Sequence, residues 1–236
     1  MKTYIIYLRD NEFSVKMATE AGESLDKFGI KYELFDGVRG RNGINVLKSY
    51  GIKPSAHVKQ ETWTDGTIGC LASHYLLWDM CAEQDEPFLI LEQDAVVIRD
   101  PRVLLDEIKR ACHLDAYLPF SSESDDQAHF NAYNQSMENY EPGVKKHPSN
   151  SFYAFYSNKD VTGSTFRGAY AYILKPEGAR EILSFIQKRG AFPADACLCE
   201  SATYLERANS TYVRLNPFFD RLATQRKFSM RAPEKK

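Results

Sequence analysis

Two acidic residues and an amide, Glu92, Gln93 and Asp94, interrupt an otherwise apolar stretch at residues 88–98. An apolar run of this length predicts a strand buried on both faces, and unpaired carboxylates are costly in such a place. A divalent cation is one partner that offsets this cost, since Mg²⁺ and Mn²⁺ bridge carboxylates to substrate phosphates. Residues two apart on an ideal strand point to the same side, so Glu92 and Asp94 suit one ligand together. The alternative is a strand followed by a turn in which both acids are simply solvated.

Strands near the N-terminus are predicted to end beside Glu92 and Asp94 and to place further polar residues there. Residues 3–8 and 32–35 have the β-branched and aromatic composition of strands, and residues 12–28 between them carry apolar side chains at helical spacing. This order predicts a βαβ unit with two parallel strands and a right-handed crossover. Ligands of parallel sheets bind beyond the carboxyl ends of the strands. The residues at these two ends, expected along one rim with the acids of 88–98, include Leu8, Arg9, Asp36 and Gly37.

A glycine-rich segment at residues 66–82 is predicted to form a helix packed under the sheet, with Asp65 as its N-cap. The backbone N–H groups at such a helix start suit a phosphate. Ser73 and His74 follow in mid-helix, but adjacent helical residues diverge by about 100 degrees and cannot easily form a nucleophile–base pair. A buried, hydrogen-bonded histidine and a serine bonded to its own helix are the ordinary alternatives.

The rest of the chain predicts a further alternation of helices and strands. The expected elements are a helix at 101–112, strands at 115–120 and 168–174, a helix at 176–188, a helix opening at about Asp195 and a strand at 212–215. Asp195 itself has the residue type of an N-cap. Residues 121–166 are polar and aromatic without clear periodicity, which favours a binding wall or lid. Residues 221–236 form a basic tail that we expect to be solvated.

Composition limits the class of protein. The 236 residues give ample material for a core, and a formal net charge of −2 gives no global field that would recruit nucleic acid or an anionic membrane. The five cysteines are an odd number without the paired spacing of a zinc site, which favours a reducing, cytosolic compartment. We expect neither a signal peptide nor a membrane span, because no apolar run approaches the ~18 residues that a span needs.

Ordered motifs over nearly the whole chain point to one known family. They are Phe35-Asp-Gly37, Gly66-x-x-Gly-Cys-x-x-Ser-His-x-x-x-Trp78, Leu91-Glu-Gln-Asp94, Gly168-x-Tyr-x-Tyr-Ile-Leu-x-Pro-x-Gly-Ala179, Pro193-x-Asp195 and Asn216-Pro217. The Gly-Cys-Ser-His-Trp helix, followed at short distance by the acidic triplet, is the most specific of these. In these motifs the chain resembles the lipooligosaccharide galactosyltransferases of glycosyltransferase family 25, which also include the collagen-hydroxylysine galactosyltransferase domains.

The resemblance implies both a fold and a site. It implies a single GT-A-like α/β domain over residues 1–220, with a mostly parallel central sheet flanked by helices and with 121–166 on the acceptor side. It also implies a UDP-sugar donor and a Mn²⁺ or Mg²⁺ ion held by Glu92 and Asp94. The residues implied to contact the nucleotide are Leu8, Arg9, Asp36, Gly37, Gly69, Ser73 and Gln93. The candidate base on the acceptor hydroxyl is Asp195, with Glu200 and His74 as reserves.

Two departures from the family pattern bear on these expectations. The family usually carries Glu-Asp-Asp, where this chain has Gln93 in the middle position. The family also usually ends the opening strand with Asn-Leu, where this chain has Tyr7 and Leu8. The donor sugar or the metal dependence can therefore differ from those of the relatives.

The predicted function is metal-assisted transfer of a hexose, galactose or glucose, from a UDP-sugar to a hydroxyl of a lipooligosaccharide-type glycan by in-line displacement. A phage-type transferase acting on a hydroxymethylated DNA base is one alternative, although the net charge does not indicate DNA. A nucleotide-sugar binding protein without catalysis is another alternative, in which Gln93 in place of the usual acid would indicate the loss of activity. A two-metal phosphohydrolase is disfavoured, since it needs more carboxylates and histidines than this rim offers. We expect a cytoplasmic protein and leave peripheral attachment to a membrane open.

Overall fold

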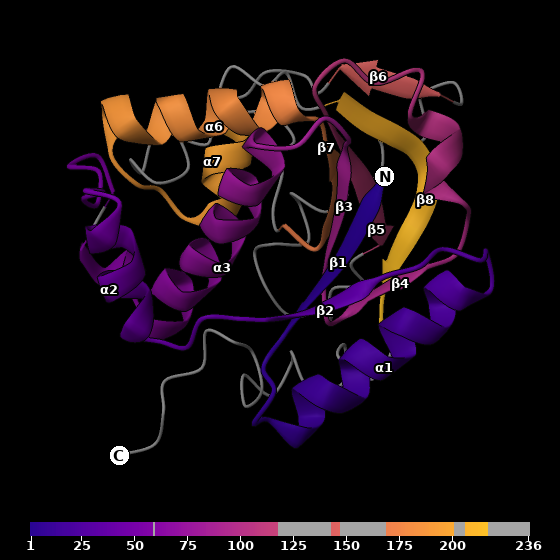
Figure 1. The fold of residues 1–236 in the computed structure, drawn as a ribbon, viewed down its shortest axis with the longest axis horizontal. Helices are drawn as coiled ribbons and strands as arrows, with labels where there is room; N and C mark the ends of the chain where they lie inside the picture. Colours follow the sequence, from indigo (N-terminus) through magenta and orange to yellow (C-terminus); the bar gives the residue numbers. More distant parts are fainter. Residues whose placement is uncertain (59, 118–142, 147–168, 201–205, 217–236) are drawn as a thin grey trace, which may run out of the picture.

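The computed structural model describes residues 1–58, 60–117, 143–146, 169–200 and 206–216 (Figure 1). Within these ranges eight strands form one sheet in the order β2-β1-β3-β7-β5-β8-β4, and β6 pairs with β8. The strands are β1 Lys2–Tyr7, β2 Glu33–Asp36, β3 Phe88–Glu92, β4 Ala95–Val97, β5 Ala111–Tyr117, β6 Val144–Lys146, β7 Ala171–Leu174 and β8 Glu206–Leu215. The helices are α1 Glu12–Asp26, α2 Asn42–Ser49, α3 Asp65–Ala82, α6 Pro176–Arg189 and α7 Ala194–Glu200, with short 3-10 helices η1 Gln60–Thr62 and η2 Pro101–Leu104.

Five of the eight described strands run in one direction. β1 lies parallel to both β2 and β3, and β5 lies parallel to β8. β7 separates these two groups and pairs antiparallel with β3 and with β5, so the two groups share one direction. β4 and β6 run opposite to β8. The predicted α/β class, with a mostly parallel central sheet flanked by helices, is confirmed.

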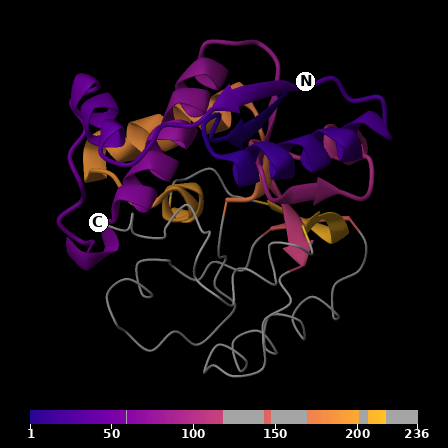
Figure 2. The same ribbon diagram turned by 90° about the horizontal axis from the view of Figure 1, so that it is seen from below.

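Alternating side chains of the sheet enter two separate cores. Phe88 and Ile90 of β3 pack in a cluster with residues of α2, α3, α6 and α7, whereas Leu89 and Leu91 pack with α1 on the other face. Figure 1 shows α3, α6 and α7 on one side of the sheet and α1 on the opposite side. Figure 2, turned by 90°, keeps α2, α3, α6 and α7 together and α1 apart from them. The same alternation places Glu92, at the end of β3, on the α3 face.

Two helices begin at residues whose side chains satisfy free backbone N–H groups. Asn11 accepts a hydrogen bond from Ser14 N at 3.0 Å and starts α1. Thr64 starts α3, because its Oγ1 accepts from Thr67 N at 3.1 Å, and Asp65 lies in the first turn. The prediction of Asp65 as the cap was wrong by one residue, since threonine and aspartate are both good N-caps and local sequence does not choose between them.

The apolar stretch 88–98 is two strands and not one. β3 ends at Glu92, residues 93–94 form a turn, and β4 begins at Ala95. β4 then pairs antiparallel with β8, and the carbonyl of Asp94 accepts a hydrogen bond from Asn216 N at 2.8 Å. An apolar run looks the same whether one buried strand or two successive ones use it, so periodicity did not locate the break.

The predicted helix at 101–112 is wrong. Pro101–Leu104 is a short 3-10 helix, and β5, Ala111–Tyr117, begins before the predicted strand at 115–120, whose residues 118–120 lie outside the described part of the chain. Leu104 and Ile108 do reach the core on the α1 face, which explains their helix-like spacing. β5 is held between β7 and β8, and this pairing with strands from much later in the chain overrides the local preference.

The other predicted elements are confirmed or lie outside the described residues. The strands at 3–8, 32–35, 168–174 and 212–215 correspond to β1, β2, β7 and the end of β8, and the helices at 12–28, 66–82, 176–188 and near Asp195 to α1, α3, α6 and α7. Of the predicted lid at 121–166, residues 143–146 are described, and they include strand β6. The tail at 221–236 and the predicted domain limit at 220 lie outside the described residues. Among the helices that are described, none is both long and apolar enough to cross a membrane.

Candidate active site

The carboxyl ends of β1, β2 and β3 lie side by side at one edge of the sheet, and we call this edge the rim. Tyr7 at the end of β1 is paired with Asp36 at the end of β2, and Ile6 is paired with Glu92 at the end of β3. The N–H of Gly37 donates to the carbonyl of Tyr7 at 2.7 Å, which extends the pairing beyond the strands. The prediction that these ends form one rim is confirmed, and the order β2-β1-β3 centres it on β1.

Arg9 and Asp36 are joined across this rim. The backbone N–H of Arg9 donates to Asp36 Oδ1 at 3.2 Å, and Arg9 Nε lies 3.3 Å from Asp36 Oδ2. The Arg9 side chain is 72% exposed, so the ion pair leaves most of the guanidinium open to solvent. A second guanidinium, that of Arg39, pairs with Asp10 on the loop after β1. Guanidinium groups bind diphosphates well, because their planar N–H groups match phosphate oxygens.

Gly69 and Ser73 hold the loop after β2 against α3. Ser73 Oγ accepts a hydrogen bond from Val38 N and donates one to the carbonyl of Gly69, both at 2.8 Å. Ser73 is buried, and the open face of Gly69 packs directly on the backbone of residues 38–40. Both residues are thus buried in the contact between α3 and this loop, and their contact with the nucleotide stays a prediction.

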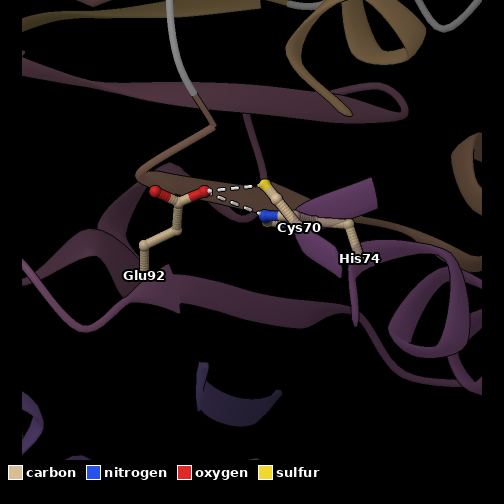
Figure 3. Close-up of side chains that lie close together, drawn as sticks. All are labelled: Cys70, His74 and Glu92. Atoms are coloured by element: carbon tan, nitrogen blue, oxygen red, sulfur yellow. Dashed lines mark hydrogen bonds and ion pairs between the residues drawn. The ribbon is translucent and has the colours of Figure 1, made fainter. Parts of the chain in front are cut away.

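Glu92 is directed toward α3. Its Oε1 lies 3.1 Å from His74 Nε2 and 3.6 Å from Cys70 Sγ. Figure 3 shows the second carboxylate oxygen of Glu92 pointing away from both of these residues. The Glu92 side chain keeps 16% of its surface exposed.

Asp94, unlike Glu92, does not lie in a strand. It lies in the turn after β3, where strand alternation has ended, so the expected same-side placement of the two carboxylates does not follow from the strand. Asp94 is also more buried than Glu92, at 4% exposure. The pair nevertheless supplies hard oxygen donors within three residues at the rim, and this donor chemistry fits Mn²⁺ or Mg²⁺.

His74 is fully buried between α3 and β7. Its Nδ1 lies 2.7 Å from Tyr172 Oη, which also accepts a hydrogen bond from Trp78 Nε1 at 2.8 Å. Burial raises the pKa of Tyr172 well above its ordinary value, so the phenol keeps its proton. Both ring nitrogens of His74 are hydrogen-bonded inside the protein, and its reserve role as a base on an acceptor hydroxyl stays a prediction.

Three members of this cluster, Cys70, Trp78 and Tyr172, were not among the predicted site residues. Cys70, His74 and Trp78 follow one another at intervals of four, so they share one face of α3. This spacing was visible in the Gly-Cys-x-x-Ser-His-x-x-x-Trp motif and was a usable signal. Tyr172 is 98 residues away from His74, and the motif from Gly168 to Ala179 that contains it did not indicate this contact.

Asp195 lies in the first turn of α7, a helix that packs against α3 and α6. It is 5% exposed, and its Oδ1 accepts a hydrogen bond from Ala196 N at 2.9 Å. Because α7 begins at Ala194, Asp195 is a first-turn residue and not the cap. Its role as a base stays a prediction. Glu200 is the last residue of α7, and its side chain lies outside the described part of the chain.

Residues 1–198 match the family model described as "Glycosyltransferase family 25 (LPS biosynthesis protein)". The chain belongs to glycosyltransferase family 25. The matched region contains the whole rim and extends through β7 and α6 to Asp195. The α/β sheet agrees with the GT-A-like fold that the resemblance implied.

Individual relatives of this family 25 chain are distant. Over 69 residues it is 30% identical to the lipooligosaccharide biosynthesis protein lic2B of Haemophilus influenzae, and the match spans 29% of this chain and 25% of that protein. Among solved structures, apo mouse xyloside xylosyltransferase 1 aligns over 84% of this chain and 80% of its own, at 12% identity and a TM-score of 0.40.

Gln93 occupies the middle of the triplet in which family 25 usually has a second acid. Its side chain turns toward α1, where Ser14 Oγ donates to Gln93 Oε1 at 3.3 Å and accepts the N–H of Leu8 at 2.7 Å. Gln93 is 6% exposed and lies on the face opposite to Glu92. It therefore links the end of β3 to α1, and its contact with the nucleotide stays a prediction.

Proposed function

We propose that this family 25 protein transfers a hexose, galactose or glucose, from a UDP-sugar to a hydroxyl group of a lipooligosaccharide-type glycan. The observation that carries the proposal is the family match over residues 1–198, which spans every residue of the rim. The family description names lipopolysaccharide biosynthesis, and the Haemophilus relative is a lipooligosaccharide biosynthesis protein. Both support an acceptor of this class.

The rim supplies groups for each part of a nucleotide-sugar donor. Arg9 presents an exposed guanidinium that would bind the diphosphate, and the backbone of Leu8 and Gly37 lines the same edge. Glu92 and Asp94 would hold a Mn²⁺ or Mg²⁺ ion against that diphosphate. When bound, such an ion offsets the negative charge that develops on the departing nucleoside diphosphate.

The remaining task of the protein is to orient the acceptor hydroxyl and take its proton. Attack with inversion at the anomeric carbon requires a base within reach of that hydroxyl. Asp195 is our candidate, because it is a carboxylate on α7, and α7 packs on the helix that carries Cys70 and His74 beside Glu92. The acceptor would then lie on the α3 face of the sheet, the face to which Glu92 is directed.

Donor binding is tested by thermal unfolding of the purified protein with a panel of nucleotide sugars, each with and without Mn²⁺. A ligand at ~100 times its Kd adds about 2.7 kcal/mol of stability, which is readily visible as a rise in Tm. We expect one UDP-sugar to stabilise the protein only when Mn²⁺ is present, and Asp94→Asn to abolish that effect. Asp26→Asn, at the exposed end of α1, is the matched control and should keep the full rise. The proposal fails if no nucleotide sugar raises Tm in either condition.

Transfer is tested with the stabilising donor and a lipooligosaccharide acceptor. Mass spectrometry should show one added hexose with the parent protein and with Asp26→Asn, and none with Asp94→Asn. Stable donor binding without transfer to any glycan, and without hydrolysis of the donor, would instead favour a nucleotide-sugar binding protein that has lost catalysis.

A further inference from the structure

Four side chains from three elements form a continuous row beneath the rim. Trp78 and His74 come from α3, Tyr172 from β7 and Glu92 from the end of β3. Tyr172 Oη lies 2.8 Å from Trp78 Nε1 and 2.7 Å from His74 Nδ1, and His74 Nε2 lies 3.1 Å from Glu92 Oε1. Trp78, Tyr172 and His74 are fully buried, so their polar atoms depend on partners within the protein.

The chemistry of Trp78 fixes the direction of the first hydrogen bond in this row and favours one direction for the other two. An indole N–H can only donate, so Tyr172 Oη accepts from Trp78. The hydroxyl proton of Tyr172 is then directed to its other neighbour, His74 Nδ1. With Nδ1 acting as an acceptor, the imidazole carries its proton on Nε2 and donates it to Glu92 Oε1.

We propose that His74 is a positioning residue, which through this directed row sets the orientation of the Glu92 carboxylate at the rim. The inference rests on the proposed function, in which Glu92 helps to hold the cation of the donor diphosphate. A carboxylate that accepts a hydrogen bond on one oxygen is restricted in its rotation, and partners of this kind orient metal-binding side chains. Figure 3 shows the arrangement, with one oxygen of Glu92 facing His74 and Cys70 and the other facing away.

The ligand atoms of Cys70, His74 and Glu92 lie within 4.8 Å of one another, a spacing that would also suit Zn²⁺. Zinc needs the lone pair of His74 Nε2, which moves the ring proton to Nδ1. Tyr172 Oη would then face two N–H donors, from His74 and from Trp78, and the phenol proton would lose His74 as its acceptor in a buried position. The direction of the row therefore favours positioning of Glu92 over zinc binding.

The protonated nitrogen of His74 can be read directly, without donor or metal. A long-range ¹H–¹⁵N correlation spectrum of labelled protein at pH 8 distinguishes the two neutral tautomers, and His74→Gln identifies the His74 signals by their loss. We expect the proton on Nε2. A proton on Nδ1 would overturn the inference, as would stoichiometric zinc in the purified protein that His74→Gln removes.

The effect on Glu92 is measured as the Kd of Mn²⁺ in the presence of UDP, by electron paramagnetic resonance of the free ion. His74→Leu removes the donor to Glu92 while filling most of the same space, and we expect Mn²⁺ to bind about 10–100-fold more weakly. His74→Gln places an amide N–H near the position of Nε2 and should recover part of this loss. Asp26→Asn, at the exposed end of α1, is the control and should keep the Mn²⁺ affinity of the parent.

A merely structural role for His74 predicts a different pattern. Both His74 variants would then lose thermal stability without a selective loss of Mn²⁺ affinity, and glutamine would not restore binding. Circular dichroism establishes that each variant is folded before binding is compared, and unchanged Mn²⁺ affinity in folded His74→Leu overturns the inference. If the parent protein binds no UDP with Mn²⁺, the proposed function fails. The tautomer of His74 still shows whether its Nε2 donates a hydrogen bond to Glu92.

Discussion

A Cβ atom on Gly69 of α3 would lie 2.5 Å from the carbonyl oxygen of Val38, in the loop that follows β2. Glycine permits this approach, which brings Ser73, one turn later on α3, within 2.8 Å of Val38 N. The loop that borders the donor rim is thus fixed by the close packing of a helix on a backbone segment.

Gly69→Ala should destabilise the protein by about 1–3 kcal/mol, because the backbone atoms it meets cannot move aside as a flexible side chain can. In a helix interior alanine is otherwise more favourable than glycine by up to ~1 kcal/mol, so a net loss of stability would indicate the clash. Urea unfolding measures the change. Gly22→Ala in α1 is the matched control, since its Cβ meets the ring end of Tyr32, which can shift, and it should lose much less. Equal losses in the two variants would contradict the packing of α3 on the loop.

Removing the hydroxyl of Ser14 should loosen the rim at Leu8 and Gln93. Ser14→Ala takes away the acceptor for the Leu8 N–H and the donor to Gln93 Oε1, and we expect the free energy of unfolding to fall by about 1–3 kcal/mol. Ser49→Ala, at an exposed serine bonded to the Val46 carbonyl of its own helix, should change it by less than about 0.5 kcal/mol. Denaturant titration compares the two. An equally small change in Ser14→Ala would show that this link adds no stability.

Cys70 should be alkylated much faster than Cys81 in the native protein. Of the four cysteines whose side chains are described, Cys70 is partly exposed and Cys81, Cys112 and Cys197 are buried free thiols. Burial raises the pKa of Cys81 to about 12, so only ~10⁻⁴ of this thiol is the reactive thiolate at pH 8. Because the pKa is raised, the reaction of native Cys81 should increase about tenfold per pH unit between pH 7 and 9 and stay slow throughout.

Timed alkylation followed by peptide mass spectrometry measures these rates. In concentrated urea the cysteines should react alike, which controls for differences in peptide detection. Native Cys81 reacting as fast as Cys70 would be inconsistent with its burial under β7, where its Sγ donates to the Leu174 carbonyl.

Asp195→Asn should lower kcat by about 10²–10⁴-fold if Asp195 takes the proton of the acceptor hydroxyl. The Kd of the donor should stay close to that of the parent, because the donor rim is formed by β1, β2 and β3 rather than by α7. Steady-state transfer kinetics and calorimetric donor titration separate the two effects, with Asp26→Asn as the control. A variant that keeps its kcat would remove Asp195 from the reaction and leave its carboxylate as a support for the first turn of α7.

Local sequence determined those parts of the fold in which residues close together in the chain specify the secondary structure. The composition of residues 3–8 and 32–35, with a helical pattern between them, was sufficient for β1, α1 and β2, because a βαβ unit has one strongly preferred hand. The rim followed from this, since parallel strands end at the same edge. The motif from Gly66 to Trp78, with the acidic triplet, was sufficient for the family.

The segment at 101–112 shows where local pattern fails. Its apolar spacing suits a helix, yet Ala111 begins a strand that pairs with β7 and β8. The residue types near Ala111 do not indicate that pairing. The break after Glu92 was hidden for the same reason, because the turn at 93–94 depends on the pairing of β4 with β8.

Only the tertiary structure decided where the polar side chains of the site point. Glu92 and Gln93 are adjacent, and strand geometry alone separates them, but packing determines that one reaches His74 on α3 and the other Ser14 on α1. His74 looked like an isolated histidine in mid-helix until β7 brought Tyr172 to 2.7 Å from its ring. Buried polar groups form hydrogen bonds with whichever element the completed sheet places beside them. Local periodicity does not predict these partners, because they come from distant parts of the chain.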